Sequence, residues 1–166
     1  GASAAATEKM YITSTGNVNM KNTATGDDTP VTLTLQTGET DIAAADKLGV
    51  INFQAPDEGT GTDAILVAAG IEAISEGDFS SSNNATKLSF KTAASEAATE
   101  KMHITSAGNV NMKNTATGDD TPVVLTLQTG ETDIAASDKL GVINFQAPDE
   151  GTGTDAILVA AGIEAV

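Results

Sequence analysis

The chain contains nearly the same sequence twice, at a period of 92 residues. Residues 1–74 match residues 93–166 with seven substitutions, whereas residues 75–92 occur once, between the two copies. Repeats of this length usually form one structural unit each and stack along an axis, because each unit contacts mainly its neighbours. The sequence therefore predicts an elongated array: a first repeat at residues 1–92, whose residues 75–92 form a strand segment between the copies, and a second, incomplete repeat at residues 93–166.

Within each copy, apolar and polar residues alternate with a period of two over several short stretches. In residues 31–36, Val31, Leu33 and Leu35 share one face, and threonine or glutamine occupies the other. This alternation is typical of half-buried β-strands, and Gly, Pro, Asn and Asp mark the turns between the stretches. The pattern predicts an all-β chain of short strands. The expected strands lie in residues 9–14, 17–21, 31–36, 49–55 and 86–91.

Residues 63–75, "DAILVAAGIEAIS", are open to two interpretations. A helix could begin at Asp63, but Gly70 in the middle of the segment would cost such a helix about 1 kcal/mol. A period of two also fits, with Ile65, Val67 and Ile71 on one face and small or apolar residues on most of the other. Both faces would then suit a buried sheet, which favours a strand.

The chain has few large apolar side chains from which to build a core. Aromatic residues make up 3% of the sequence and tryptophan is absent. Such side chains supply most of the burial energy of a compact monomer, so we expect the core to be completed by other copies of the chain. The alternative, disorder, is disfavoured by the 40% hydrophobic content and by the alternation. Together with their counterparts in the second copy, the residues expected to point inward are Met10, Ile12, Val18, Met20, Val31, Leu33, Leu35, Ile51, Phe53, Ile65, Val67, Ile71, Leu88 and Phe90.

The composition excludes several classes of partner. With 8 Lys and Arg against 23 Asp and Glu, the chain lacks the clustered cations that bind nucleic-acid phosphates. No apolar run is long enough to cross a bilayer, so we expect no membrane insertion, and the first residues do not have the pattern of a signal peptide. Disulfides and thiolate metal sites are excluded because the sequence contains no cysteine.

The stretch "TEKMHITSAGNVNM", residues 99–112, resembles the element "ERMRITSAGNVGIG" of bacteriophage tail-fibre and tail-spike proteins, especially those of phages of marine bacteria. The runs "DKLGVINFQAPDEGTGTDAILVAAGIEA" and "ATKLSFKTAASEAATEKM" resemble the same family, so the resemblance covers nearly the whole chain. Tyr11 and His103 stand where the family usually carries arginine.

This resemblance implies a structural shaft repeat in a tail appendage of a virion. Such shafts are elongated repeat fibres, usually parallel intertwined homotrimers with a β-prism or triple β-helix-like arrangement. The chain would act as a stiff spacer in host attachment, with flanking repeats on either side and the host-surface receptor bound through another part of the fibre. Two alternatives remain open: a repeat module of a bacterial surface adhesin or extracellular filament, located at the cell surface, and repeats that bind host glycans themselves.

Few residues suggest a chemical site. The single histidine, His103, is replaced by Tyr11 in the other copy, and no nucleophile or orienting acid stands at a spacing that indicates catalysis. We expect neither enzymatic activity nor a cofactor. Acidic turns are the simplest explanation of the two "PDEGTGTD" loops, although calcium also favours oxygen ligands in glycine-rich loops. The calcium candidates are Asp57, Glu58, Asp63, Asp149, Glu150 and Asp155.

Overall fold

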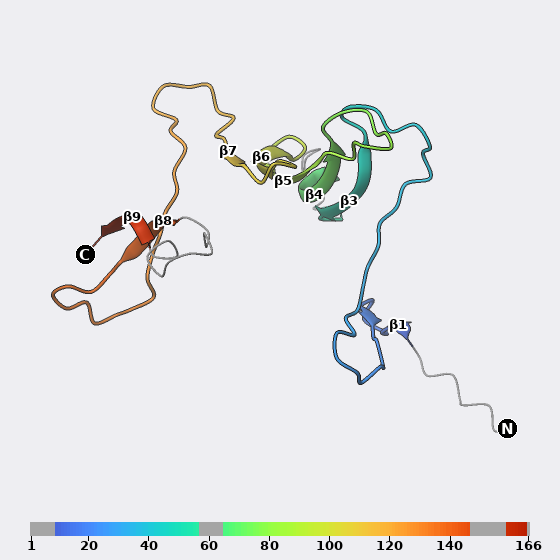
Figure 1. Ribbon diagram of the computed structural model, residues 1–166, viewed down its shortest axis with the longest axis horizontal. Coiled ribbons are helices and arrows are strands. Elements are labelled where there is room, and N and C mark those ends of the chain that lie inside the picture. The colour runs from blue at the N-terminus through green and yellow to red at the C-terminus, as the bar shows by residue number, and fades with distance from the viewer. Residues whose placement is uncertain (1–8, 57–64, 147–158, 166) are drawn as a thin grey trace, which may run out of the picture. The chain divides into compact units, whose positions relative to one another are not determined.

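The computed structural model describes residues 9–56, 65–146 and 159–165 (Figure 1). All the elements with assigned bounds in these ranges are strands, which confirms the all-β fold class for the described part of the chain. None of the described residues forms a helix of the length and apolarity needed to span a membrane. The strands are β1 (Met10–Ile12), β2 (Val18–Met20), β3 (Lys47–Gln54), β4 (Val67–Ser75), β5 (Thr86–Thr92), β6 (Thr99–Ile104), β7 (Val110–Met112), β8 (Gly141–Gln146) and β9 (Val159–Ala165).

The strands form three antiparallel sheets, in each of which neighbours in sequence are neighbours in space. Strands β1 and β2 form a hairpin, β3 to β7 form a five-stranded meander, and β8 and β9 form a second hairpin. The chain divides into two compact units, Gly1–Lys113 and Asn114–Val166, so the first two sheets belong to one unit and the third to the other. This order needs no crossover connection, because each strand pairs antiparallel with the next strand in the sequence.

Corresponding strands of the two copies pair in the same register. Met10 faces Met20 in the first hairpin, as Met102 faces Met112 in the meander. Strands β8 and β9 repeat the pairing of β3 and β4, with phenylalanine opposite alanine and isoleucine opposite isoleucine at equivalent positions. Near-identical sequences thus direct the same local pairing twice.

The turn between β1 and β2 shows how the sequence sets this register. Gly16 has a φ of 85°, a left-handed conformation that glycine adopts without steric cost. The Gly16 amide donates to the Thr13 carbonyl oxygen at 2.9 Å, and the Asn17 amide donates to Thr13 Oγ1 at 2.9 Å. The equivalent turn between β6 and β7 has Gly108 at a φ of 81°. The element "TSxGN" is therefore a hairpin turn in both copies.

The ambiguous segment 63–75 contains a strand, as predicted. Strand β4 lies between β3 and β5 and therefore pairs on both edges. Gly70 is buried in it, and a Cβ at this position would come within 3.1 Å of the Ile51 carbonyl oxygen and 3.2 Å of Asn52 Oδ1. The glycine that weakened the helix interpretation is thus favoured by the close approach of β3, since a larger residue would push against its backbone. Asp63, the proposed start of the helix, lies outside the described residues.

The prediction of a strand in residues 31–36 was wrong: this segment has no strand assignment, and neither does its counterpart, residues 123–128. Instead, it places Leu35 against Gly49 of β3, so closely that a Cβ at residue 49 would lie 2.9 Å from Leu35 Cβ. The alternation of apolar and polar residues in 31–36 therefore belongs to a segment that packs Leu35 on the sheet but does not pair with an edge strand. Intrinsic β-propensity alone does not supply the neighbouring strand that a ladder needs.

Candidate functional site

The five-stranded meander has one face made almost entirely of apolar side chains, here called the apolar face. Its register aligns one residue from each strand in a row across the sheet, and a second row runs parallel to it. Because side chains two residues apart share a face, both rows lie on the same side. The first row is Ile51, Ile71, Phe90, Met102 and Met112, and the second is Gly49, Ala73, Leu88, Ile104 and Val110.

The apolar face is largely uncovered within a single chain. Ile51 is 41% exposed, Leu88 is 40% exposed and Val110 is 59% exposed. Leu35 covers one part of the face and borders a cavity of about 140 Å³, whose lining also includes Ile71 and Ala73. Among the described hydrophobic residues, Ala98 is the one that is buried, with 6% of its surface exposed. Of the residues predicted to point inward, Ile51, Ile71, Leu88 and Phe90 share this face, but the single chain leaves most of the predicted set exposed.

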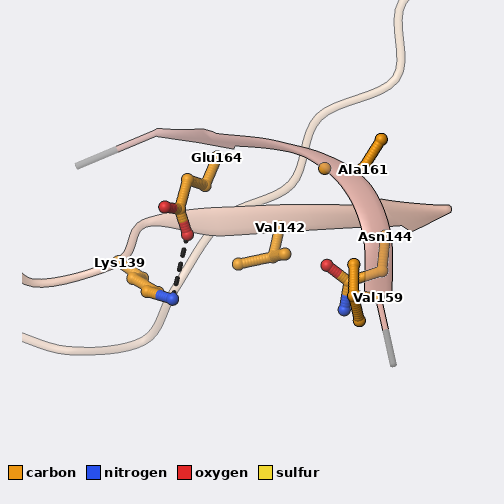
Figure 2. Close-up of a pocket in the computed structure, with 7 residues that line it drawn as sticks. Lys139, Val142, Asn144, Val159, Ala161 and Glu164 are labelled. Carbon is orange, nitrogen blue, oxygen red and sulfur yellow. Dashed lines mark ion pairs between the residues drawn. The ribbon is translucent and has the colours of Figure 1, made fainter. Parts of the chain in front are cut away.

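The hairpin of β8 and β9 carries an open groove of about 560 Å³ on its polar side (Figure 2). Lys139 Nζ lies 2.9 Å from Glu164 Oε2 at one end of the groove, and Val142 and Asn144 line its floor. Both charged side chains are well exposed, at 62% and 47%. An ion pair so accessible to water contributes little to stability.

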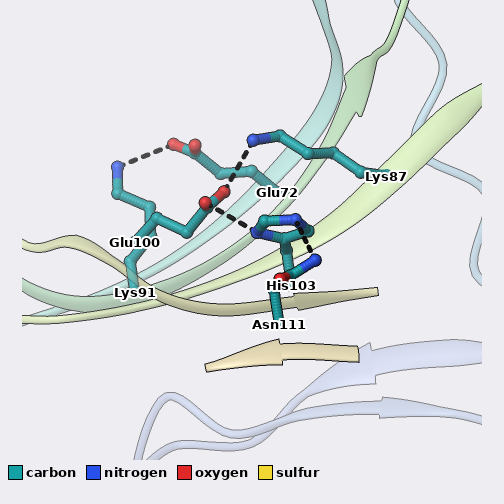
Figure 3. Close-up of polar contacts among 6 residues, drawn as sticks. All are labelled: Glu72, Lys87, Lys91, Glu100, His103 and Asn111. Atoms are coloured by element: carbon teal, nitrogen blue, oxygen red, sulfur yellow. Dashed lines mark hydrogen bonds and ion pairs between the residues drawn. The ribbon is translucent and has the colours of Figure 1, made fainter. Parts of the chain in front are cut away.

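The equivalent carboxylate in the first copy has a different environment. Glu72 on β4 accepts from Lys47 Nζ at 2.8 Å and from Lys91 Nζ at 2.9 Å, and its side chain is only 5% exposed (Figure 3 shows the Lys91 contact). Burial raises the pKa of Glu72, but the hydrogen bonds and charges of the two lysines outweigh it, so the pKa lies below its ordinary value. The second lysine, Lys91, comes from β5, which pairs with β4. Among the described residues, β9 pairs with β8 and has no neighbour equivalent to β5.

A second polar cluster joins β5, β6 and β7 (Figure 3). Lys87 Nζ lies 2.8 Å from Glu100 Oε2, and His103 Nδ1 lies 2.8 Å from Glu100 Oε1. Asn111 Nδ2 lies 3.3 Å from His103 Nε2. Burial raises the pKa of the Glu100 carboxyl, but hydrogen bonds from its neighbours, Lys87 foremost, lower it to about 2. The carboxylate therefore stays ionised and bridges its strand to β5.

The cluster around His103 is suited to holding strands together. With Asn111 donating to Nε2, the proton on Nδ1 points at Glu100, and both ring nitrogens are engaged by neighbours within the sheet. Tyr11 occupies the equivalent position of the first hairpin and is exposed. The sequence analysis missed both polar clusters. The available signal was the pair of lysines, Lys87 and Lys91, that flank Ser89 on the face opposite Leu88 and Phe90.

The calcium candidates Asp57, Glu58, Asp63, Asp149, Glu150 and Asp155 all lie outside the described residues. Within the ranges that the structure describes, no group of three or more His, Asp or Glu side chains could hold a metal ion.

The two equivalent glutamates give a matched test of the polar clusters. Glu72→Gln should destabilise the chain by roughly 1–3 kcal/mol, because it removes the charge that partners two lysines in a nearly buried site. Glu164→Gln should change the free energy of unfolding by less than about 1 kcal/mol, since its single ion pair is exposed. Urea denaturation followed by circular dichroism measures both. An equal decrease in the free energy of unfolding for both variants would contradict the difference in environment between Glu72 and Glu164.

Comparisons of the chain with protein-family models, with curated proteins and with solved structures give no match.

Proposed function

We propose that the chain is a structural shaft segment of a bacteriophage tail fibre, a stiff repetitive spacer in host attachment within the virion's tail appendage. In this proposal three parallel copies intertwine as a homotrimer of the β-prism or triple β-helix-like kind. The observation that carries the proposal is the apolar face, which spans five strands and is left open by its own chain.

Burial of this face would supply the stability that the single chain lacks. Each large side chain removed from water contributes about 1.5–3 kcal/mol. Ile51, Leu88 and Val110, all more than a third exposed, are spread across the sheet from β3 to β7. Other copies of the chain are suited to cover them, because each copy presents the same face. An assembly that closes around an axis also protects strand edges, which otherwise invite aggregation.

The repeat extends this interface along the fibre. The second copy has isoleucine and phenylalanine at the positions equivalent to Ile51 and Phe53, paired in the same register. A period of 92 residues would therefore present equivalent apolar positions to the shared core again and again. The net charge of −15 keeps the outer surfaces of separate fibres apart by repulsion. The number of three chains and the phage context rest on the resemblance of residues 99–112 and their flanks to tail-fibre repeats.

Sedimentation equilibrium tests the assembly. At micromolar concentration we expect a species of three times the chain mass of 16.7 kDa. A folded species with the mass of one chain would overturn the proposal. Electron microscopy of the sample should show rods of uniform width, and compact particles in their place would contradict the role as a shaft.

A further inference from the structure

Residues 29–38, here called the extended segment, present one open apolar side. No turn or bend interrupts residues 29–39, so successive side chains point in opposite directions. Val31, Leu33 and Leu35 therefore share one side, and Thr32 and Thr34 lie on the other. All three apolar side chains are exposed, Leu33 to 59%. The segment has the alternation of a strand, yet the described part of its own chain leaves most of its apolar side open to water.

The equivalent segment of the second copy, residues 121–130, is open to the same degree. Leu125 is 60% exposed, and the two apolar residues on the same side of the segment are exposed as well. The five-stranded meander follows the first segment, whereas the hairpin of β8 and β9 follows the second. Because the exposure is the same before two different sheets, the open side is a property of the segment itself. Val124, which replaces Thr32, lies on the other side, and nothing in the structure explains this substitution.

One end of each segment contacts a sheet. Leu35 lies against Gly49 of β3 and borders the cavity on the apolar face, whose lining also includes Ile71. In the second copy, Leu127 lies against Gly141 of β8 in the same way. The open side of the segment therefore continues the apolar face, which the proposed function assigns to contacts with other chains. A neighbouring chain that covers the face is placed to cover the rest of the segment as well.

Charge and symmetry indicate which part of the neighbouring chain covers the segment. Residues 29–38 contain no charged side chain, although the whole chain has a net charge of −15. Acidic chains repel one another, so an uncharged segment is a favourable place for their close approach. In a closed assembly, rotation about the axis carries each residue to its equivalent at the same height along that axis. A segment that lies along the axis therefore meets the same segment of the next chain in register.

We propose that the extended segments of neighbouring chains lie side by side, parallel and in register. Val31, Leu33 and Leu35 of each chain then contact the same residues of the next chain, and Thr34 stays in water. Residues 121–130 repeat the contact one period along the fibre. The inference rests on the proposed function, because a closed assembly of parallel chains supplies the partner.

The full chain with Leu33→Cys tests the contact, because the sequence contains no other cysteine. Under mild oxidation by air it should form a disulfide between chains, which non-reducing electrophoresis shows as a species of two chain masses. Cysteine behaves as a small apolar residue, so the substitution preserves the character of the position. The matched variant Thr34→Cys should crosslink at least tenfold less, because adjacent side chains of an extended segment point to opposite sides.

The direction of the contact is tested with two further variants, Val31→Cys and Leu35→Cys, one of which carries a tag that changes its electrophoretic mobility. The two chains are mixed in urea and refolded together before oxidation. In a parallel contact in register, each variant meets its own kind. Mixed disulfides should then be at least tenfold rarer, because four residues of extended chain separate the two positions by about 13 Å. An antiparallel contact centred on Leu33 would give mostly mixed disulfides.

Equal crosslinking of Leu33→Cys and Thr34→Cys would overturn the inference, as would a majority of mixed disulfides. The outcomes also separate it from the proposed function. A trimer in the centrifuge that does not crosslink through Leu33→Cys would refute the side-by-side segments alone. Site-specific crosslinking in a species of two chains would refute the trimer alone, and a monomeric chain without crosslinking would refute both.

Discussion

Replacing Val18 and Val110 by lysine should weaken self-association at least about 100-fold. The two residues are equivalent in the two copies, each is 59% exposed in the single chain, and each faces an isoleucine across its hairpin. Because assembly can bury only the exposed 59% of each valine, losing both removes about 2–3.5 kcal/mol per chain, and each 1.4 kcal/mol changes an equilibrium constant tenfold. A lysine ammonium forced into the shared core adds a further cost. Sedimentation equilibrium measures the change.

Thr25→Lys with Thr117→Lys is the matched control. These residues are equivalent in the two copies, and both are exposed and lie outside the strands. The control pair adds the same charge and should leave association within about threefold of the unmodified chain. Circular dichroism establishes that all variants remain β-structured. Similar weakening by both pairs would contradict an assembly through the apolar face, and so would an unchanged valine variant.

Strands with strict alternation were predictable from the sequence because their pairing is local. The hairpins of β1 with β2 and of β6 with β7 need only a period of two and a glycine that tolerates positive φ, and residues 9–21 supply both. Strand β4 was predictable for a related reason, since Gly70 disfavours a helix. Residues 31–36 alternate equally well, yet their conformation depends on where a neighbouring edge lies. Propensity carries no information about that distant partner.

The candidate interface was predictable in part, and the polar clusters were not. Alternation groups Ile51 with Phe53 and Leu88 with Phe90, so the members of the apolar face follow from the sequence. A register shift between β3 and β4 lies beside Lys47, a partner of Glu72, and a second shift, between β5 and β6 at Phe90 and Lys91, lies beside Glu100. Such irregularities affect which lysine lies next to which carboxylate, and the local pattern of apolar and polar residues does not predict them. The sequence VAAGIEA also occurs in both β4 and β9, and its environment differs between them because the neighbouring strands differ.

Acid should destabilise the five-stranded sheet between about pH 4.5 and pH 2, chiefly through Glu100. The pKa of this carboxyl is about 2 in the folded chain and 4.5 as its ordinary value. As the pH falls, the unfolded chain therefore binds a proton before the folded chain does, and the equilibrium shifts toward unfolding. The contribution of Glu100 is complete above pH 4.5 and disappears near pH 2. Glu72, whose pKa is also lowered, acts in the same direction.

Glu100→Gln should remove this part of the pH dependence. At neutral pH the variant should be less stable by about 2 kcal/mol, since each unit of pKa shift corresponds to about 1.4 kcal/mol and the partial exposure of Glu100 reduces the total. Near pH 2 the two chains should have nearly the same free energy of unfolding, because protonation of Glu100 in the unmodified chain then removes the stabilisation that its negative charge provides. Urea denaturation at a constant chain concentration measures both curves, and Glu39→Gln controls for the loss of one exposed carboxylate. A stability difference that persists undiminished at pH 2 would mean that Glu100 acts through packing. In that case its ion pair with Lys87 would not be what joins β6 to β5.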